Sequence, residues 1–113
     1  MIELDRQLFQ LCKPEGVFRQ DDDTFVEEEG RRHGYWSPST YWSDMEPLIV
    51  AAANAAKLDF DSKYIVEKGW PDHWECGFDL LSDNPVGLTY GPTLCEAAAR
   101  ALISLLTAKA GKG

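Results

Sequence analysis

Residues 73–81 alternate apolar side chains with other residues at a period of two, and this run constrains the fold most. Its apolar members are Trp74, Cys76, Phe78 and Leu80. Because successive side chains of a strand point to opposite faces, the spacing predicts a β-strand with one buried face. Two more strand-like runs lie at 60–67 and 86–90, and the second is expected to place Val86, Leu88 and Tyr90 on one face. Short connections favour antiparallel pairing of neighbouring strands, so we predict a three-stranded antiparallel sheet.

Two helices are expected before this sheet. Residues 2–12 repeat apolar side chains at helical spacing, and residues 48–57 form a run rich in small apolar residues. The second helix has two candidate starts. Ser43 and Glu46 have the spacing of a capping box, and Asp44 is the alternative N-cap.

The clearest helix start in the chain is Thr93, which precedes Glu96 by three residues. This spacing is a capping box, in which each side chain bonds the backbone N–H of the other residue. An apolar stripe from Leu94 to Leu106 follows it, which predicts a helix with one face against the sheet. The glycines in segment 109–113 indicate a frayed tail.

Together these elements predict an α+β fold with the order α-loop-α-β-β-β-α. Helices are expected to pack on a three-stranded antiparallel sheet, with a fourth strand as an alternative. The chain has 113 residues, and domains typically have about 100–200. We therefore expect a single domain, 1–113.

Residues 14–33 show no periodicity and carry two acidic clusters. Like charges at this density favour a solvated segment, so we predict an acidic loop or insertion here. A short strand over residues 24–27 is the alternative for its centre. Long loops in compact domains are often functional.

The composition narrows the class of partner. The net charge of −8 comes from 19 acidic and 11 basic residues. Nucleic-acid binding draws most of its affinity from Lys and Arg, so direct binding of DNA or RNA is disfavoured. No apolar run approaches the ~20 residues that span a bilayer, and no membrane contact is expected. Three widely spaced cysteines and the lack of a signal-like start favour a soluble protein of a reducing compartment.

Residue patterns for catalysis or metal binding are missing from the sequence. His73 and Cys76 are three apart on a predicted strand and therefore point to opposite faces. The acidic segment lacks the glycine and the closing glutamate of an EF-hand loop. Cys95, in the first turn of the last helix, is the one candidate nucleophile, but core packing is the favoured interpretation of this residue. We predict no catalytic residues, no metal site and no cofactor.

Candidate binding residues come from the acidic segment and from aromatic residues beside turns. Trp is enriched at binding hot spots, and Trp36 and Trp70 are expected at the surface. Arg31 and Arg32 lie next to Trp36 in the chain. The full candidate set is Asp21, Asp22, Asp23, Glu27, Glu28, Glu29, Arg31, Arg32, Trp36 and Trp70.

Four short motifs follow one another along the chain. They are Trp36-Ser37-Pro38-Ser39-Thr40-Tyr41-Trp42, then Pro47-Leu48-Ile49, then Trp74, and then Gly91-Pro92-Thr93 leading to Ala99-Arg100-Ala101. This series resembles the phage ABA-sandwich domain family of small phage and prophage proteins, over roughly residues 34–108. The acidic insertion before it departs from the family pattern.

The resemblance implies a phage or prophage accessory protein in the cytoplasm of a bacterial host, and it carries over no catalytic residue. We expect this protein to bind a host or phage protein. A sharper version is anti-defence activity, in which the carboxylates mimic nucleic-acid phosphates. One alternative is a small-molecule-binding protein or enzyme with a pocket near Cys95 and Trp74. Another is a structural or self-assembling phage component, and a small homo-oligomer is compatible with each.

Overall fold

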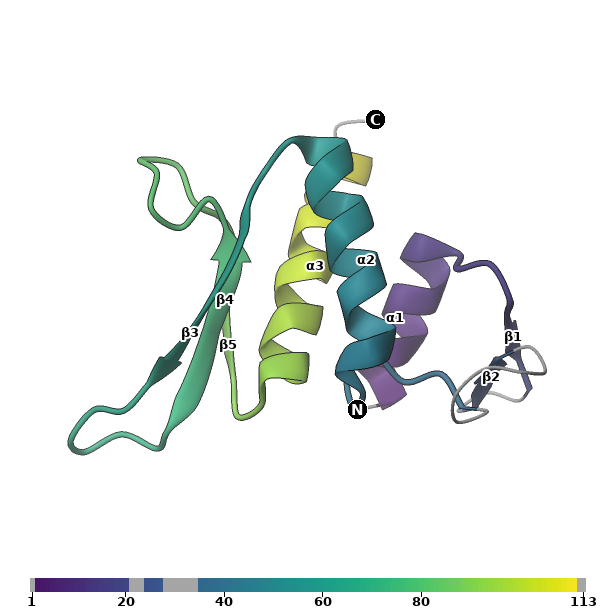
Figure 1. Ribbon diagram of the computed structural model, residues 1–113, viewed down its shortest axis with the longest axis horizontal. Coiled ribbons are helices and arrows are strands. Elements are labelled where there is room, and N and C mark those ends of the chain that lie inside the picture. The colour runs from purple at the N-terminus through teal and green to yellow at the C-terminus, as the bar shows by residue number, and fades with distance from the viewer. Residues whose placement is uncertain (1, 21–23, 28–34, 112–113) are drawn as a thin grey trace.

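The computed structural model describes residues 2–20, 24–27 and 35–111. Within these ranges the chain forms three helices and two antiparallel sheets (Figure 1). The larger sheet lies at one end of the molecule, the smaller one at the other, and the helices lie between them. The predicted α+β class is confirmed. None of the described helices is long and apolar enough to cross a membrane.

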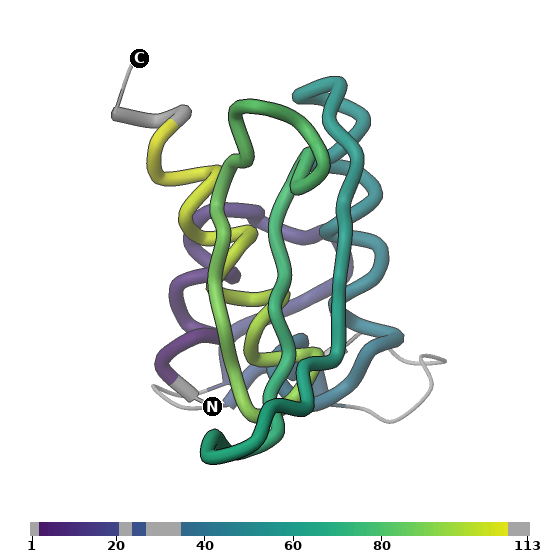
Figure 2. The backbone as a smooth tube through the Cα atoms, turned by 90° about the vertical axis from the view of Figure 1, so that its left-hand side faces the viewer, coloured from purple at the N-terminus to yellow at the C-terminus, as the bar shows by residue number. Residues whose placement is uncertain are grey.

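The larger sheet consists of β3 (Phe60–Ile65), β4 (His73–Phe78) and β5 (Val86–Gly91) in the order β3-β4-β5. All neighbours are antiparallel, as the alternation and the short connections predicted. Cys76 pairs with Ser62 on one side and with Thr89 on the other. Figure 2 shows the three strands side by side, with the helices behind them.

A register irregularity between Cys76 and Phe78 changes which residues of β5 face the helices. Gly87 lies at this point with a φ of +65°. Val86 packs against the core, whereas Leu88 and Tyr90 are exposed. The prediction that the side chains of residues 86, 88 and 90 share one face is therefore wrong. An extra residue in one strand reverses the alternation beyond it.

Helix α3 (Leu94–Gly111) is the central element of the helical layer. It contacts β4 and β5 on one side and α1 (Ile2–Cys12) and α2 (Trp42–Ala56) on others. The Thr93 cap is confirmed, because the Glu96 backbone N donates to Thr93 Oγ1 at 3.2 Å. The helix extends to Gly111, three residues into the expected tail. The side chains fully buried on it are small or medium in size, namely Ala97, Ala98, Ala99, Ala101 and Leu102.

Helix α2 begins at Trp42 and not at either predicted cap. Tyr41 holds the N-cap position and makes no side-chain cap bond. The Asp44 carboxylate instead accepts the backbone N–H of Ser37 at 2.9 Å, and Glu46 accepts the indole N–H of Trp42 at 2.9 Å. The two carboxylates that the pattern assigned to capping are thus used in other hydrogen bonds, Asp44 with the preceding turn and Glu46 with Trp42 within the helix.

The predicted loop at 14–33 contains a two-stranded sheet that the sequence reading missed in part. β1 (Val17–Arg19) pairs antiparallel with β2 (Phe25–Glu27). The second strand was the alternative considered for this segment, and the first was not expected. Both strands have only three residues, too few for a clear period of two.

Trp36 is buried, which contradicts its expected exposure. Only 5% of the residue is accessible. Its ring lies 5.8 Å from that of Phe25 and 6.1 Å from that of Phe9, both in edge-to-face geometry. Trp36 therefore ties the small sheet to α1 and is core rather than a binding residue.

A buried carboxylate joins α1 to the turn that precedes α2. Asp5 is 6% exposed. Its Oδ2 accepts Ser37 Oγ–H at 2.7 Å, and its Oδ1 accepts the backbone N–H of Ser39 at 2.9 Å. Because the single hydroxyl hydrogen of Ser37 is donated to Asp5, the 2.9 Å contact with Thr40 Oγ1 has Thr40 as donor. The Trp-Ser-Pro-Ser-Thr stretch thus acts as an anchor for α1.

Substitution of Gly87 by Ala is expected to destabilise the fold more than substitution of Gly69. Both glycines have positive φ. An added Cβ at Gly87 would lie 2.8 Å from the carbonyl oxygen of Ala101, whereas one at Gly69 would meet nothing within 4 Å. We expect Gly69→Ala to cost about 1 kcal/mol through backbone strain. Gly87→Ala should lower the free energy of unfolding by ~2–3 kcal/mol more than Gly69→Ala does, because the added methyl group overpacks the contact with α3. Urea unfolding of both variants measures the difference. Equal losses would contradict the close approach of α3 to β5.

Asp5→Ala is expected to lower the free energy of unfolding by about 2–3 kcal/mol, because it removes the acceptor of the part-buried Ser37 hydroxyl and of the buried Ser39 N–H. Ser37→Ala should cost ~1 kcal/mol. The double variant should cost less than the sum, since both remove the same bond. Glu3→Ala on the exposed side of α1 is the control, with an expected change within about 0.5 kcal/mol. Strict additivity would rule out the proposed coupling.

Candidate binding groove

The face of the larger sheet that points away from the helices is not covered by any element in the described part of the chain (Figure 2). Leu88 and Tyr90 project from this face, and each is exposed by more than two fifths. Antiparallel sheets commonly leave one face in water, but that face is then mostly polar. Large apolar side chains here mark a surface suited to binding.

A groove of about 550 Å³ lies where β4 begins and β5 ends. We call it the Trp70 groove. It is lined by Trp70, Pro71, Asp72, His73, Tyr90, Gly91, Pro92 and Arg100. Its volume is within the range of ligand sites, about 300–1,000 Å³. Three rings of aromatic character and two proline rings form most of its wall.

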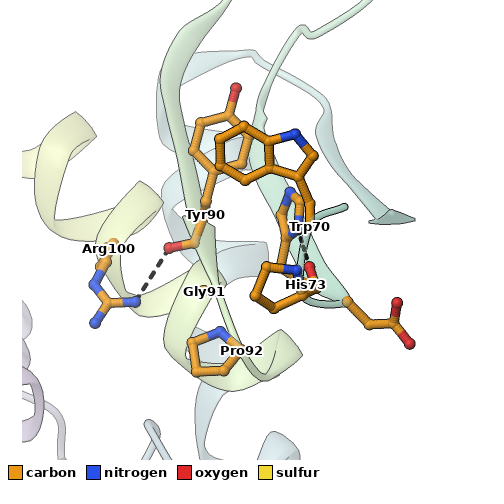
Figure 3. Close-up of a pocket in the computed structure, with 8 residues that line it drawn as sticks. Trp70, His73, Tyr90, Gly91, Pro92 and Arg100 are labelled. Atoms are coloured by element: carbon orange, nitrogen blue, oxygen red, sulfur yellow. Dashed lines mark hydrogen bonds between the residues drawn. The ribbon is translucent and has the colours of Figure 1, made fainter. Parts of the chain in front are cut away.

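Three segments position this wall. Trp70 and Pro71 belong to the connection between β3 and β4, where the Trp70 backbone N–H donates to the carbonyl of Glu67 at 3.1 Å. Tyr90 is the second-last residue of β5, and Pro92 follows in the turn into α3. In Figure 3 Trp70 and Tyr90 extend to the same side, and Pro92 lies at the other end. Trp70 is 68% exposed, so its predicted position at the surface is confirmed.

His73 has a defined tautomer in the groove. Its Nδ1 lies 2.9 Å from the carbonyl oxygen of Pro71. Because a carbonyl only accepts, Nδ1 carries the hydrogen, and Nε2 of the neutral ring is left as an acceptor. The ring also contacts Tyr90 edge-to-face at 5.7 Å. His73 therefore supports the aromatic wall and offers one acceptor.

Arg100 closes the groove from α3. Its guanidinium donates to the backbone carbonyl of Tyr90 at 3.1 Å (Figure 3). It also lies 3.9 Å from the Glu96 carboxylate, one helical turn earlier. Arg100 therefore links α3 to the backbone of β5.

Of the predicted binding residues that the structure describes, only Trp70 lies in the groove. Glu27 ends β2, where it pairs with Val17 at the opposite end of the molecule (Figure 1). Trp36 is buried beside α1. The remaining candidates lie outside the described residues: Asp21, Asp22, Asp23, Glu28, Glu29, Arg31 and Arg32.

The cysteines are held as neutral thiols. Burial raises the pKa of Cys12 to about 11 and, with a smaller effect of nearby Glu75, raises the pKa of Cys76 to about 12. The pKa of Cys95 is also raised, first by burial and then by the carboxylates of Asp5 and Asp44. These effects outweigh the helix dipole, which favours a thiolate. Neither Cys95 nor Trp74 lines the Trp70 groove.

Across residues 2–20, 24–27 and 35–111, no three His, Cys, Asp or Glu side chains gather closely enough to hold a metal ion. The ring of His73 is directed at a backbone carbonyl and at Tyr90. It does not meet a cysteine. The chemistry that the groove offers is apolar and aromatic contact with few hydrogen-bonding groups.

Sequence reasoning missed the other seven residues that line the groove, among them His73, Tyr90, Pro92 and Arg100. Tyr90 was assigned to the same face as Val86, and a glycine inside a strand is the signal that warns of a bulge. Pro92 and Arg100 were read as features of helix entry and of the last helix. Nothing in their spacing shows that the turn after β3 would fold back beside them.

No protein-family model, no curated protein and no solved structure matches this chain. The fold and the groove are therefore interpreted from their own geometry.

Native cysteines are expected to resist alkylation. A raised pKa means that the proton is retained to higher pH. At pH 8 the thiolate fraction of Cys12 should therefore lie about a hundredfold below that of a thiol with the usual value of 9.0. Iodoacetamide labelling followed by mass spectrometry should show slow modification in buffer, fast modification in urea, and a native rate that rises with pH. Labelling of Cys95 as fast in buffer as in urea would revive the nucleophile alternative.

Proposed function

We propose that this protein is a protein-binding module that captures its partner through the Trp70 groove. The observation that supports this is Trp70 itself, a large apolar side chain that is 68% exposed at the edge of an apolar groove. Burying such a ring contributes more to association than burying most other side chains, and Trp is enriched at binding hot spots. In keeping with the family resemblance, the proposal includes a phage or prophage accessory role with a host or phage protein as partner.

The groove supports protein binding better than catalysis. Its residues offer broad apolar contact, one histidine acceptor and an arginine that is bonded to the backbone. General acid–base or nucleophilic catalysis needs paired groups within hydrogen-bonding distance. The Trp70 groove presents no such pair among its lining residues. A surface of this kind recognises a partner by shape and apolar contact.

Anti-defence activity by acidic mimicry is the sharper version of this proposal, and it would use a different surface. That surface would be the acidic segment 21–29, of which the structure describes Thr24 and β2, and β2 lies at the opposite end of the molecule from the larger sheet (Figure 1). Binding by this segment should weaken steeply with salt. The two surfaces can be separated experimentally, since Trp70 contributes nothing to acidic mimicry.

Trp70→Ala is expected to abolish specific capture of partner proteins. The immobilised wild-type protein and the variant would be incubated with bacterial lysate, and the bound proteins compared by quantitative mass spectrometry. Loss of a hot-spot Trp costs about 2 kcal/mol or more, so capture should fall more than tenfold. Because the ring is mostly exposed, the variant should unfold within about 0.5 kcal/mol of the wild type.

The matched control is Phe18→Ala, which removes a ring that is 55% exposed on β1 at the other end of the molecule. Proteins lost with Trp70→Ala and kept with Phe18→Ala support the groove. An identical set of proteins bound by all three forms would overturn it. Binding of each captured protein would then be confirmed in purified form by calorimetry.

A further inference from the structure

The Trp70 groove has the wall chemistry of a site for extended proline-containing chains. We propose that its occupant is a segment of the partner in the polyproline II conformation, with basic residues beside the prolines. This inference rests on the protein-binding function proposed above and specifies what that function recognises. Four features of the groove carry it, and each is independent of the others.

The first feature is the stacking surface. The rings of Trp70, His73 and Tyr90 provide flat apolar faces, and Pro71 and Pro92 add rigid aliphatic rings. Proline-rich segments dock into aromatic-lined grooves because the pyrrolidine ring fits against flat faces and the extended helix is already ordered before binding.

The second feature is an available donor. Among the residues that the structure describes, no acceptor is bonded to Trp70 Nε1, whereas Trp42 Nε1 is occupied by Glu46. A polyproline II chain has no internal hydrogen bonds, and its carbonyls remain as acceptors. The indole N–H of Trp70 is therefore available as a donor to one of them.

The third feature excludes the main alternative for an extended peptide, which is addition as a strand to the free edge of β5. Strand addition needs the carbonyl groups that point outward from that edge. The carbonyl of Tyr90 already accepts the Arg100 guanidinium at 3.1 Å, as Figure 3 shows. At the groove, Arg100 therefore already occupies the carbonyl that an added strand would need from the edge of β5. An extended ligand here must bind through its side chains and carbonyls.

The fourth feature is charge. The chain carries a net charge of −8, and residues 66–75, which include Trp70, hold three carboxylates and one lysine. The carboxylates are Glu67, Asp72 and Glu75. Glu75 lies directly across from Tyr90 in the strand pairing, on the same exposed face. Basic residues on either side of the prolines would complement this field.

The test uses the indole N–H signals of the full-length, uniformly ¹⁵N-labelled protein. Four tryptophans give four such signals, and the Trp70 signal is the one that disappears in Trp70→Phe. The probe is a blocked oligoproline peptide with an arginine at each end. One comparison peptide replaces the prolines with alternating alanine and glycine, and another replaces the arginines with glutamates.

The oligoproline peptide with arginines should shift the Trp70 signal and bind at least tenfold more tightly than the alanine–glycine peptide. The peptide with glutamates should bind several-fold more weakly than the one with arginines. That difference should shrink between about 50 and about 500 mM NaCl, because salt screens the flanking charges. Phe18→Ala should leave all affinities unchanged.

Two variants separate stacking from hydrogen bonding. Trp70→Phe keeps a flat ring but removes the donor, so the affinity should fall about fivefold, the equivalent of one hydrogen bond. Trp70→Ala removes both and should reduce affinity more than tenfold. Equal affinity in wild type and Trp70→Phe would overturn the role of the indole N–H.

Failure of this inference differs from failure of the proposed function. If the alanine–glycine peptide or an amphipathic helical peptide perturbs Trp70 as strongly as the proline peptide does, the polyproline assignment is wrong and protein binding by the groove stands. If no peptide perturbs Trp70 and lysate capture does not depend on Trp70, both are wrong.

Discussion

The close contact between α3 and β5 is the constraint on which the rest of the structure depends. Gly87 and Gly91 have no side chain on the strand, and the helix presents Ala97 and Ala101 to them. Between them Thr89 Oγ1 donates to the carbonyl of Ala97 at 2.8 Å. The backbones can approach this closely only because both surfaces are made of small residues. Helix α3 is thereby drawn into the centre of the molecule and offers its other sides to α1 and α2.

This contact also determines what faces the solvent. Once the small residues of β5 are turned toward α3, its large ones, Leu88 and Tyr90, must project from the opposite face. The exposed aromatic surface is thus a geometric result of how the sheet meets the helix. The turn that carries Trp70 then needs only to fold beside the end of β5 for a groove to form. Fold and candidate site follow from the same placement of glycine.

The elements with long periodic patterns could be predicted from the sequence, and the short or tertiary features could not. The alternation at 73–81 and the Thr93 capping box gave β4 and the start of α3 because both signals are local. The start of α2 was misread because Asp44 bonds the turn before the helix and Glu46 bonds the indole of Trp42, so neither carboxylate acts as the pattern predicted. Trp36 was misread because its burial depends on Phe9 and Phe25, which lie in other elements.

The same distinction applies to the candidate site. Trp70 could be proposed from residue type and its place beside a turn. Tyr90 and Arg100 could not, because their contribution depends on the bulge at Gly87 and on a side chain reaching a strand backbone. A groove built from three separate segments has no signature along the chain. Its wall becomes visible only when the register of β4 and β5 is known.

The central position of α3 has a consequence for the order in which the chain can acquire its structure. This helix follows every strand in the sequence, yet α1, at the other end of the chain, packs directly against it. During synthesis the first helix would emerge long before its main partner. The contacts of α3 with the sheet, α1 and α2 can form only after α3 has left the ribosome. Contacts between such distant segments slow folding, and until α3 arrives the apolar faces that pack on it stay exposed.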